Sequence, residues 1–182
     1  MARVELIDSK AGLTPDQQEA FDEIAESRGH IVGPFRALLH LPELARRVSR
    51  LGAYVRFESG LDGALQELAI LAVARHHDAQ FEWTAHVPLA LRAGVREAAI
   101  AVIRDRRAPA GLTEDEATVW RFVHELLADK RVAGETYHAT LSLLGRDGVF
   151  EITATVGYYS LLAAFMNAFE IEPAPGVEPL AV

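Results

Sequence analysis

Apolar residues recur at helical spacing along most of the chain, and strict alternation of apolar and polar positions is not evident. In the segment that begins at Pro42, the apolar positions lie three or four residues apart, at Leu44, Val48, Leu51 and Val55. This spacing predicts an amphipathic helix that ends near Phe57, with its arginines (Arg46, Arg47 and Arg50) on the solvent side.

Two longer apolar segments predict buried helices. Residues 68–74 are seven consecutive apolar residues, so a helix over 64–77 is apolar on every side and is expected at the centre of the fold. Residues 152–169 carry no charge over 18 positions, about the lower limit for a membrane-spanning helix. Its threonines, tyrosines, serine and asparagine make it too polar for a good span, so we predict a core or oligomer-interface helix.

Helix start and stop signals define the remaining elements. Thr14-Pro15-Asp16-Gln17 and Thr113-Glu114-Asp115-Glu116 are typical N-caps, which predict helices ending near Gly29 and Asp129. Further helices are expected over 80–93 and 96–107, before Gly145 and from about residue 149. The segment 173–179 is expected to be irregular.

These elements predict an all-α fold in one domain, residues 1–182. Its regions are an N-terminal helical region (1–60), a core motif region (61–107), C-terminal helices (108–172) and a tail (173–182). The tetrapeptide at 11–14 recurs at 110–113, and Asp-Gly recurs at 62–63 and 147–148. These echoes indicate either a duplicated helical unit or a coincidence of common helix-start signals.

Composition narrows the function classes. The 182 residues carry a net charge of −8, which does not fit a basic nucleic-acid-binding protein. The chain has no cysteine, which excludes disulfides, thiolate metal sites and cysteine nucleophiles. The first residues show no apolar signal segment, so we expect a cytoplasmic protein without membrane attachment.

The segment 67–94 holds the candidate chemistry. Glu82 and His86 are four residues apart and therefore adjacent on one largely apolar helix face. A carboxylate that orients an imidazole suits general acid–base catalysis near neutral pH. The alternative is a core histidine that forms a structural pair with an incidental glutamate.

Other candidate residues also have two readings. Glu67, at the start of the apolar segment, is a candidate buried acid or an ordinary first-turn glutamate. Arg36 and Arg56 are suited to binding a substrate carboxylate, although surface ion pairing is the commoner role of arginine. Trp83 lies off the Glu82 face and is more typical of packing.

Motifs for other chemistries are not found in the sequence. The pair His124-Glu125 is not part of a His-Glu-x-x-His motif, so we expect no metal. No phosphate-binding glycine loop and no Gly-x-Ser-x-Gly motif occurs, which argues against nucleotide binding and serine hydrolase chemistry.

Glu67, the pattern Glu82-Trp83-x-x-His86 and Ala93-Gly94-Val95 together resemble the carboxymuconolactone decarboxylase and alkylhydroperoxidase D-like superfamily. The resemblance extends to Gly33-Pro34-Phe35-Arg36 and to Gly157-Tyr158-Tyr159. It implies an all-α homo-oligomer, often a trimer or hexamer, with its active site near subunit contacts.

The superfamily has a peroxidase branch and a decarboxylase branch. Peroxidase members carry Cys-x-x-Cys before the histidine, and Ala79 and Glu82 occupy those positions here. Thiol peroxidase activity is therefore chemically implausible. The decarboxylase branch uses no cofactor and shows the Glu-Trp-x-x-His pattern, although its members are shorter than this chain.

The resemblance implies a cofactor-free decarboxylase-like enzyme that acts on a small carboxylated lactone or a related aromatic-catabolism intermediate. His86, with Glu82 and Glu67, is then the catalytic group. Arg36, Arg56, Trp83 and Tyr158 are the expected substrate-binding residues. The alternative is a non-catalytic binding or scaffold protein that keeps the fold without the redox cysteines.

Overall fold

The computed structural model is built from helices, and no strand occurs in the part of the chain that it describes, which is residues 2–31, 33–173, 176, 178 and 180–181. The elements in chain order are α1 (Pro15–Arg28), α2 (Phe35–Leu38), α3 (Pro42–Ala53), η1 (Tyr54–Glu58), α4 (Gly63–His76), α5 (Gln80–Ala93), α6 (Glu97–Arg104), α7 (Glu114–Ala128) and α8 (Gly134–Phe169). The predicted all-α fold is confirmed. The tail prediction falls partly on residues 174, 175, 177 and 179, outside the described residues.

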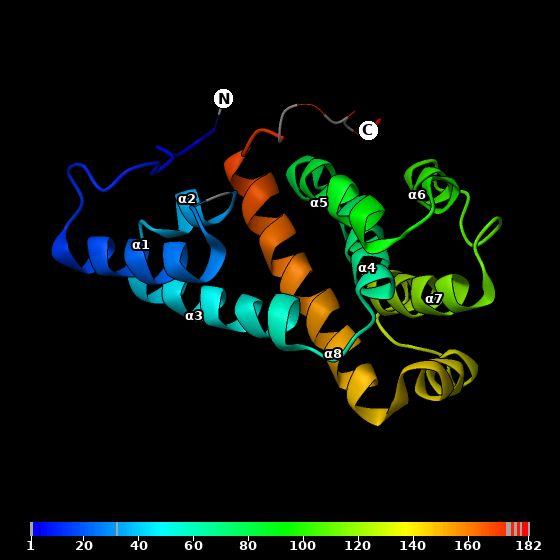
Figure 1. The fold of residues 1–182 in the computed structure, drawn as a ribbon. Coiled ribbons are helices and arrows are strands. Elements are labelled where there is room, and N and C mark those ends of the chain that lie inside the picture. Colours follow the sequence, from blue (N-terminus) through cyan, green and yellow to red (C-terminus); the bar gives the residue numbers. More distant parts are fainter. Residues whose placement is uncertain (1, 32, 174–175, 177, 179, 182) are drawn as a thin grey trace. The chain divides into compact units, whose positions relative to one another are not determined.

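The chain forms two compact units. Unit 1 comprises Met1–Ser59 with Ala164–Glu172, and unit 2 comprises Gly60–Ala163 with Pro173–Val182. In unit 1, α1 and α2 both pack against α3, as Figure 1 shows in blue and cyan. In unit 2, α4 contacts α5, α6 and α7.

Local capping explains why two of these helices begin where they do. Thr14 and Thr113 each accept a hydrogen bond from the backbone N–H three residues on, and the side chains of Gln17 and Glu116 bond back to the cap. Both capping boxes agree with the sequence prediction. Gly29, in the left-handed region, ends α1.

The central position of α4 follows from its composition. Residues 68–75 of this helix are all buried, including Leu68, Leu71 and Val73, which confirms the predicted core helix. Asp62 caps its first turn by accepting hydrogen bonds from Ala64 N and Leu65 N. α4 therefore provides a rigid support for the side chains that project from its sides.

One predicted helix end is confirmed and another is wrong. The helix from Pro42 ends near Phe57 as predicted, although it is α-helical only to Ala53 and its last turn widens into the π-helix η1, which ends at Glu58. α6 ends at Arg104 rather than near Arg107, because Arg106 adopts a left-handed backbone with φ of 55°.

Arg46 does not lie on the solvent side of α3. Its side chain is 11% exposed and contacts carboxylates of α1 and α3: Asp16, Glu19, Glu23 and Glu43. Conversely, Leu44 and Leu51 of the predicted apolar stripe are exposed. The packing of α1 against α3 therefore buries only part of the predicted apolar stripe, and it also buries Arg46.

The helix α8 bends at Gly145, where φ is 72° and ψ is 176°, so two helical segments meet at this glycine. The sequence predicted the same division. By length and composition α8 is apolar enough to cross a membrane, but half of its most apolar window is buried inside the structure. The buried half fits the predicted core or oligomer-interface helix.

Candidate active site

Three candidate residues of unit 2 meet between α4 and α5. His86 Nδ1 donates a hydrogen bond to Glu67 Oε2 at 2.7 Å, and His86 Nε2 lies 3.5 Å from Glu82 Oε2. We call these three residues the Glu67–His86–Glu82 cluster. The sequence spacing predicted the pair on α5, and packing of α4 against α5 adds Glu67.

Burial makes this cluster chemically unusual. The side chains of His86 and Glu82 are each 5% exposed, and that of Glu67 is 12% exposed. Charged groups are removed from water only at a large free-energy cost unless they pair with one another. One imidazole between two carboxylates provides such pairing, and it lets a proton be held within the cluster.

The two ring nitrogens of His86 are held differently. The 2.7 Å contact is a short charge-assisted hydrogen bond, whereas 3.5 Å is too long for a good one. Glu67 therefore fixes the orientation and tautomer of the ring. Nε2, beside Glu82, is the nitrogen with more freedom to exchange a proton.

Tyr159 is a fourth residue of the site that the sequence analysis did not select. Its ring meets that of His86 edge to face, with 5.0 Å between centroids and an angle of 89°. Tyr158, a predicted substrate-binding residue, contacts Tyr159 in the same way at 5.3 Å and is buried. The signal that could have found Tyr159 is the helical period of α8, because Tyr159 shares a buried face with Val156 and Ala163.

Trp83 is 1% exposed and fully buried. Its burial fits the packing interpretation, and its contact with substrate stays a prediction. Ala79, at one position of the missing cysteines, is buried and serves as the N-cap of α5. It lies one turn before Glu82, and α5 continues through Pro88 without ending.

The two predicted arginines belong to unit 1. Arg36 forms an ion pair with Asp8, with 2.6 Å between Arg36 Nη2 and Asp8 Oδ2, and it lines a cavity of about 540 Å³ near the N-terminal segment. Arg56 lies on η1 with its guanidinium 5.3 Å from the ring centroid of Phe57. Their roles in substrate binding stay predictions.

The described residues contain no group of three or more His, Cys, Asp or Glu side chains that the geometry indicates as a metal site. The donors that meet in unit 2 are oxygen and nitrogen groups suited to proton transfer. The fold and the cluster thus define an all-helical protein with a buried carboxylate–imidazole–carboxylate site.

Comparison with known proteins shows which family part of this chain resembles. Residues 42–125 match the Carboxymuconolactone decarboxylase family. This segment includes the whole Glu67–His86–Glu82 cluster. Together with the shared fold described below, it makes this cysteine-less chain similar to the carboxymuconolactone decarboxylase and AhpD-like superfamily.

Solved structures share the fold at low sequence identity. An uncharacterized peroxidase-related protein from Ralstonia eutropha, described as an alkylhydroperoxidase AhpD core, is 16% identical with a TM-score of 0.78, over 96% of this chain and 93% of that one. A peroxidase-related protein from a Silicibacter species is 15% identical with a TM-score of 0.75, over 96% and 92%.

A debrominase solved in complex with 2,3,4-tribromopyrrole is 12% identical with a TM-score of 0.75, over 96% of this chain and 95% of that one. Curated protein sequences include none with significant similarity to this chain. The structural neighbours therefore establish the fold and leave the reaction to be argued from the site.

Proposed function

We propose that this protein is a cofactor-free acid–base enzyme resembling 4-carboxymuconolactone decarboxylase. The observation that carries the proposal is the buried cluster in which Glu67 orients His86 beside Glu82. An imidazole held in one tautomer by a carboxylate is a typical general acid and base. The substrate class is a small carboxylated lactone or a related intermediate of aromatic catabolism.

The chemistry needs only proton transfer and charge stabilisation. When a butenolide with a carboxylate on its γ carbon loses carbon dioxide, the C–C bond to the carboxylate breaks. The electron pair of that bond passes into the ring lactone and gives a dienolate. His86 then delivers a proton to carbon, and Glu67 and Glu82 stabilise the imidazolium before that transfer. The reaction consumes no oxidant or reductant.

The superfamily also supports proposals about assembly and location. We propose a cytoplasmic homo-oligomer, a trimer or hexamer, that binds neither nucleic acid nor a membrane. Phe150 and Leu161 support a contact surface between copies. Both side chains are exposed, and they lie eleven residues apart on one face of α8.

The burial of His86 also favours a second candidate function. Both of its ring nitrogens face carboxylates, which is what a structural pair in the core requires. In that case the chain is a non-catalytic binding or scaffold protein.

One experiment separates the two candidates. Purified protein is given γ-carboxymuconolactone, and carbon dioxide release and loss of the lactone absorbance are measured for the wild type, His86→Ala and His138→Ala. His138 is an exposed histidine on α8 and serves as the matched control. A reaction with hydroperoxide and a reductant runs in parallel.

If the protein is an enzyme, His86→Ala lowers the turnover rate by about 10²-fold or more, and His138→Ala leaves it unchanged. For a structural pair, His86→Ala mainly lowers the free energy of unfolding, by about 1–3 kcal/mol, and no variant releases carbon dioxide. Peroxide turnover by this cysteine-free chain would contradict the exclusion of peroxidase activity.

A further inference from the structure

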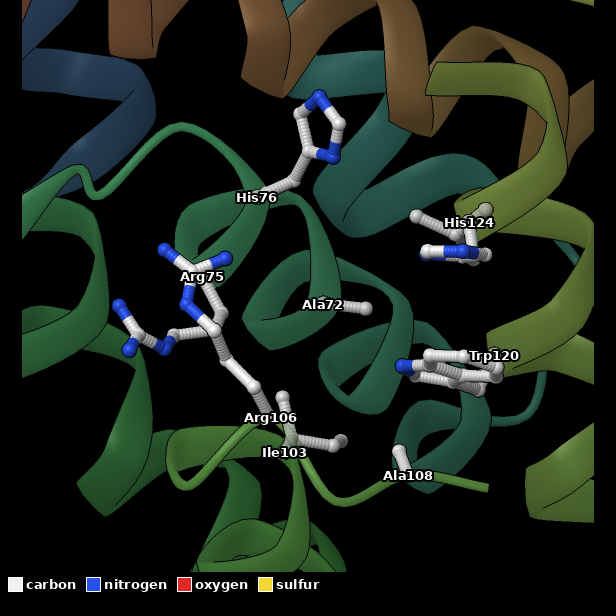
Figure 2. Close-up of a pocket in the computed structure, with 9 residues that line it drawn as sticks. Ala72, Arg75, His76, Ile103, Arg106, Ala108, Trp120 and His124 are labelled. Atoms are coloured by element: carbon white, nitrogen blue, oxygen red, sulfur yellow. The ribbon is translucent and has the colours of Figure 1, made fainter. Parts of the chain in front are cut away.

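A cavity of about 290 Å³ lies in unit 2, away from the Glu67–His86–Glu82 cluster (Figure 2). It is lined by side chains of α4, α6 and α7 and of the segment that follows α6. His76 lines it from α4, nine residues after Glu67. Nine residues of an α-helix make two and a half turns and a rise of about 13 Å. The two side chains therefore project from opposite sides of α4, and so do the two sites. We call this cavity the Trp120 pocket.

One side of the Trp120 pocket carries excess positive charge. Arg75 and Arg106 share a single carboxylate, that of Asp78, with Arg106 Nη2 at 2.8 Å from both of its oxygens. Arg75 also donates to Arg104 O at 2.7 Å and to Ala181 O, which fixes its position. None of the described side chains that line the pocket is a carboxylate.

His76 also lines the pocket, and the nearby cations affect its charge. Desolvation by the surrounding protein lowers the pKa of His76, and the electrostatic effects of His124 and Arg106 lower it further. The carboxylate of Asp78 acts in the opposite direction and raises it. His77 also meets His76 edge to face, with 5.0 Å between centroids. An anion beside Arg106 would offset the effect of these positive charges on His76.

The opposite side is aromatic and apolar. The rings of Trp120 and His124, four residues apart on α7, are stacked with 4.6 Å between centroids and an angle of 12°. Figure 2 shows this stack across the cavity from Arg75 and Arg106. Ala72 and Ile103 contribute apolar surface between the two sides.

We propose that the Trp120 pocket binds a small, planar aromatic carboxylate, with the ring against Trp120 and the carboxylate facing Arg106 and His76. A volume of about 290 Å³ is at the small end of ligand cavities, which span ~300–1,000 Å³. A guanidinium is the usual partner of a carboxylate, and an aromatic ring is held by stacking against an indole. The site is independent of the proposed reaction at His86.

The proposal is tested by calorimetric titration of the purified chain with sodium benzoate. We expect saturable binding of one benzoate per chain, with benzamide, its neutral analogue, at least tenfold weaker. Arg106→Ala is expected to weaken benzoate at least tenfold. The matched control is Arg107→Ala, which removes the same charge from a neighbouring exposed arginine that pairs with Asp105 and does not line the pocket.

Tryptophan fluorescence locates the bound ring. The chain has two tryptophans, and Trp83 is buried, so benzoate is expected to change the emission of Trp120. Replacing Trp120 with Phe is expected to remove that fluorescence change while binding persists. His86→Ala is expected to leave benzoate affinity unchanged, because His86 lies outside the pocket.

Binding is also expected to depend on pH in a defined direction. A bound carboxylate raises the pKa of His76 from its lowered value, so binding takes up a proton and weakens as the pH rises through the range in which His76 loses that proton. The groups that face His76 are His77, His124, Arg75, Arg106 and Asp78.

Four results would overturn the proposal. The first is no saturable binding of benzoate at millimolar concentrations, and the second is equal binding of benzamide. The third is equal weakening by Arg107→Ala and Arg106→Ala, which would indicate nonspecific attraction to positive charge. Binding lost in His86→Ala but kept in Arg106→Ala would place benzoate at the other site and equally reject the proposal.

Discussion

The two carboxylates of the Glu67–His86–Glu82 cluster lie at different distances from the imidazole of His86. Glu67 is well within hydrogen-bond distance of the ring, whereas Glu82 is at the outer limit of that distance. Glu67 also comes from a different helix, so its bond links α4 to α5. It is therefore a positioning residue for the imidazole and a contributor to folding stability.

We expect Glu67→Gln to lower the free energy of unfolding by about 1–3 kcal/mol, because a charge-assisted bond in a buried site becomes a neutral one. The same variant is expected to shift the pH profile of turnover, which a purely structural bond would not do. Urea unfolding and steady-state kinetics measure the two effects. Glu97→Gln, an exposed first-turn glutamate of α6, should stay within about 0.5 kcal/mol of the wild type.

Equal stability of Glu67→Gln and wild type would contradict the assignment of a linking role to Glu67.

At the scale of the elements, helix ends are decided by single residues. Gly94 ends α5 with φ of 99°, in the left-handed region, and an added Cβ there would meet no atom within 4 Å. Gly157 lies inside α8, and an added Cβ there is equally free of contacts. The two glycines thus differ in backbone conformation and not in available space.

We expect alanine at these positions to have opposite effects. Gly94→Ala should lower the free energy of unfolding by about 1–2 kcal/mol, because an L side chain is strained at this φ. Gly157→Ala should raise it by about 0.5–1 kcal/mol, because alanine loses less entropy in a helix. Thermal unfolding of both variants measures the difference, and a stabilising Gly94→Ala would refute the argument from backbone strain.

The elements predicted best from sequence were those with local signals. The caps at Thr14 and Thr113, the stop at Gly94 and the break at Gly145 all depend on neighbouring residues, and all are found in the structure. The end of α6 and the widened turn of η1 depend on how the chain continues into tertiary packing. Periodicity alone does not contain that information.

The candidate site shows the same limit. Glu82 and His86 are neighbours on one helix, so their spacing predicted their contact. Glu67 joins them only because α4 packs against α5, and the contact of Tyr159 with His86 needs α8 as well. The sequence indicated each residue type, but only the packing of three helices shows which ones meet.

For the whole molecule, a partly buried histidine makes stability sensitive to acid. Burial lowers the pKa of His77, the positive charge of His76 lowers it further, and Asp78 opposes both. His77 Nε2 lies 3.1 Å from Ser160 Oγ. Because its folded-state pKa is below the unfolded value, this contribution to stability is full above the ordinary histidine pKa of 6.5 and is lost as the pH falls below it.

We therefore expect the free energy of unfolding to decline from pH 7.5 toward pH 5.5, and His77→Gln to reduce this decline. Urea unfolding at several pH values gives the comparison. The exposed His138→Gln is the control and should follow the wild type. An identical pH dependence in His77→Gln would show that protonation of His77 is not coupled to unfolding.

Unit 1 brings together residues that are far apart in the chain. Arg3 N donates to Phe169 O at 2.8 Å, and the side chain of Arg3 bonds to Ala168 O and Glu170. During translation the ribosome makes the first of these partners more than 160 residues before the last. The N-terminal helices therefore leave the ribosome without the segment that completes their unit, and unit 1 can finish folding only after nearly the whole chain has been synthesised.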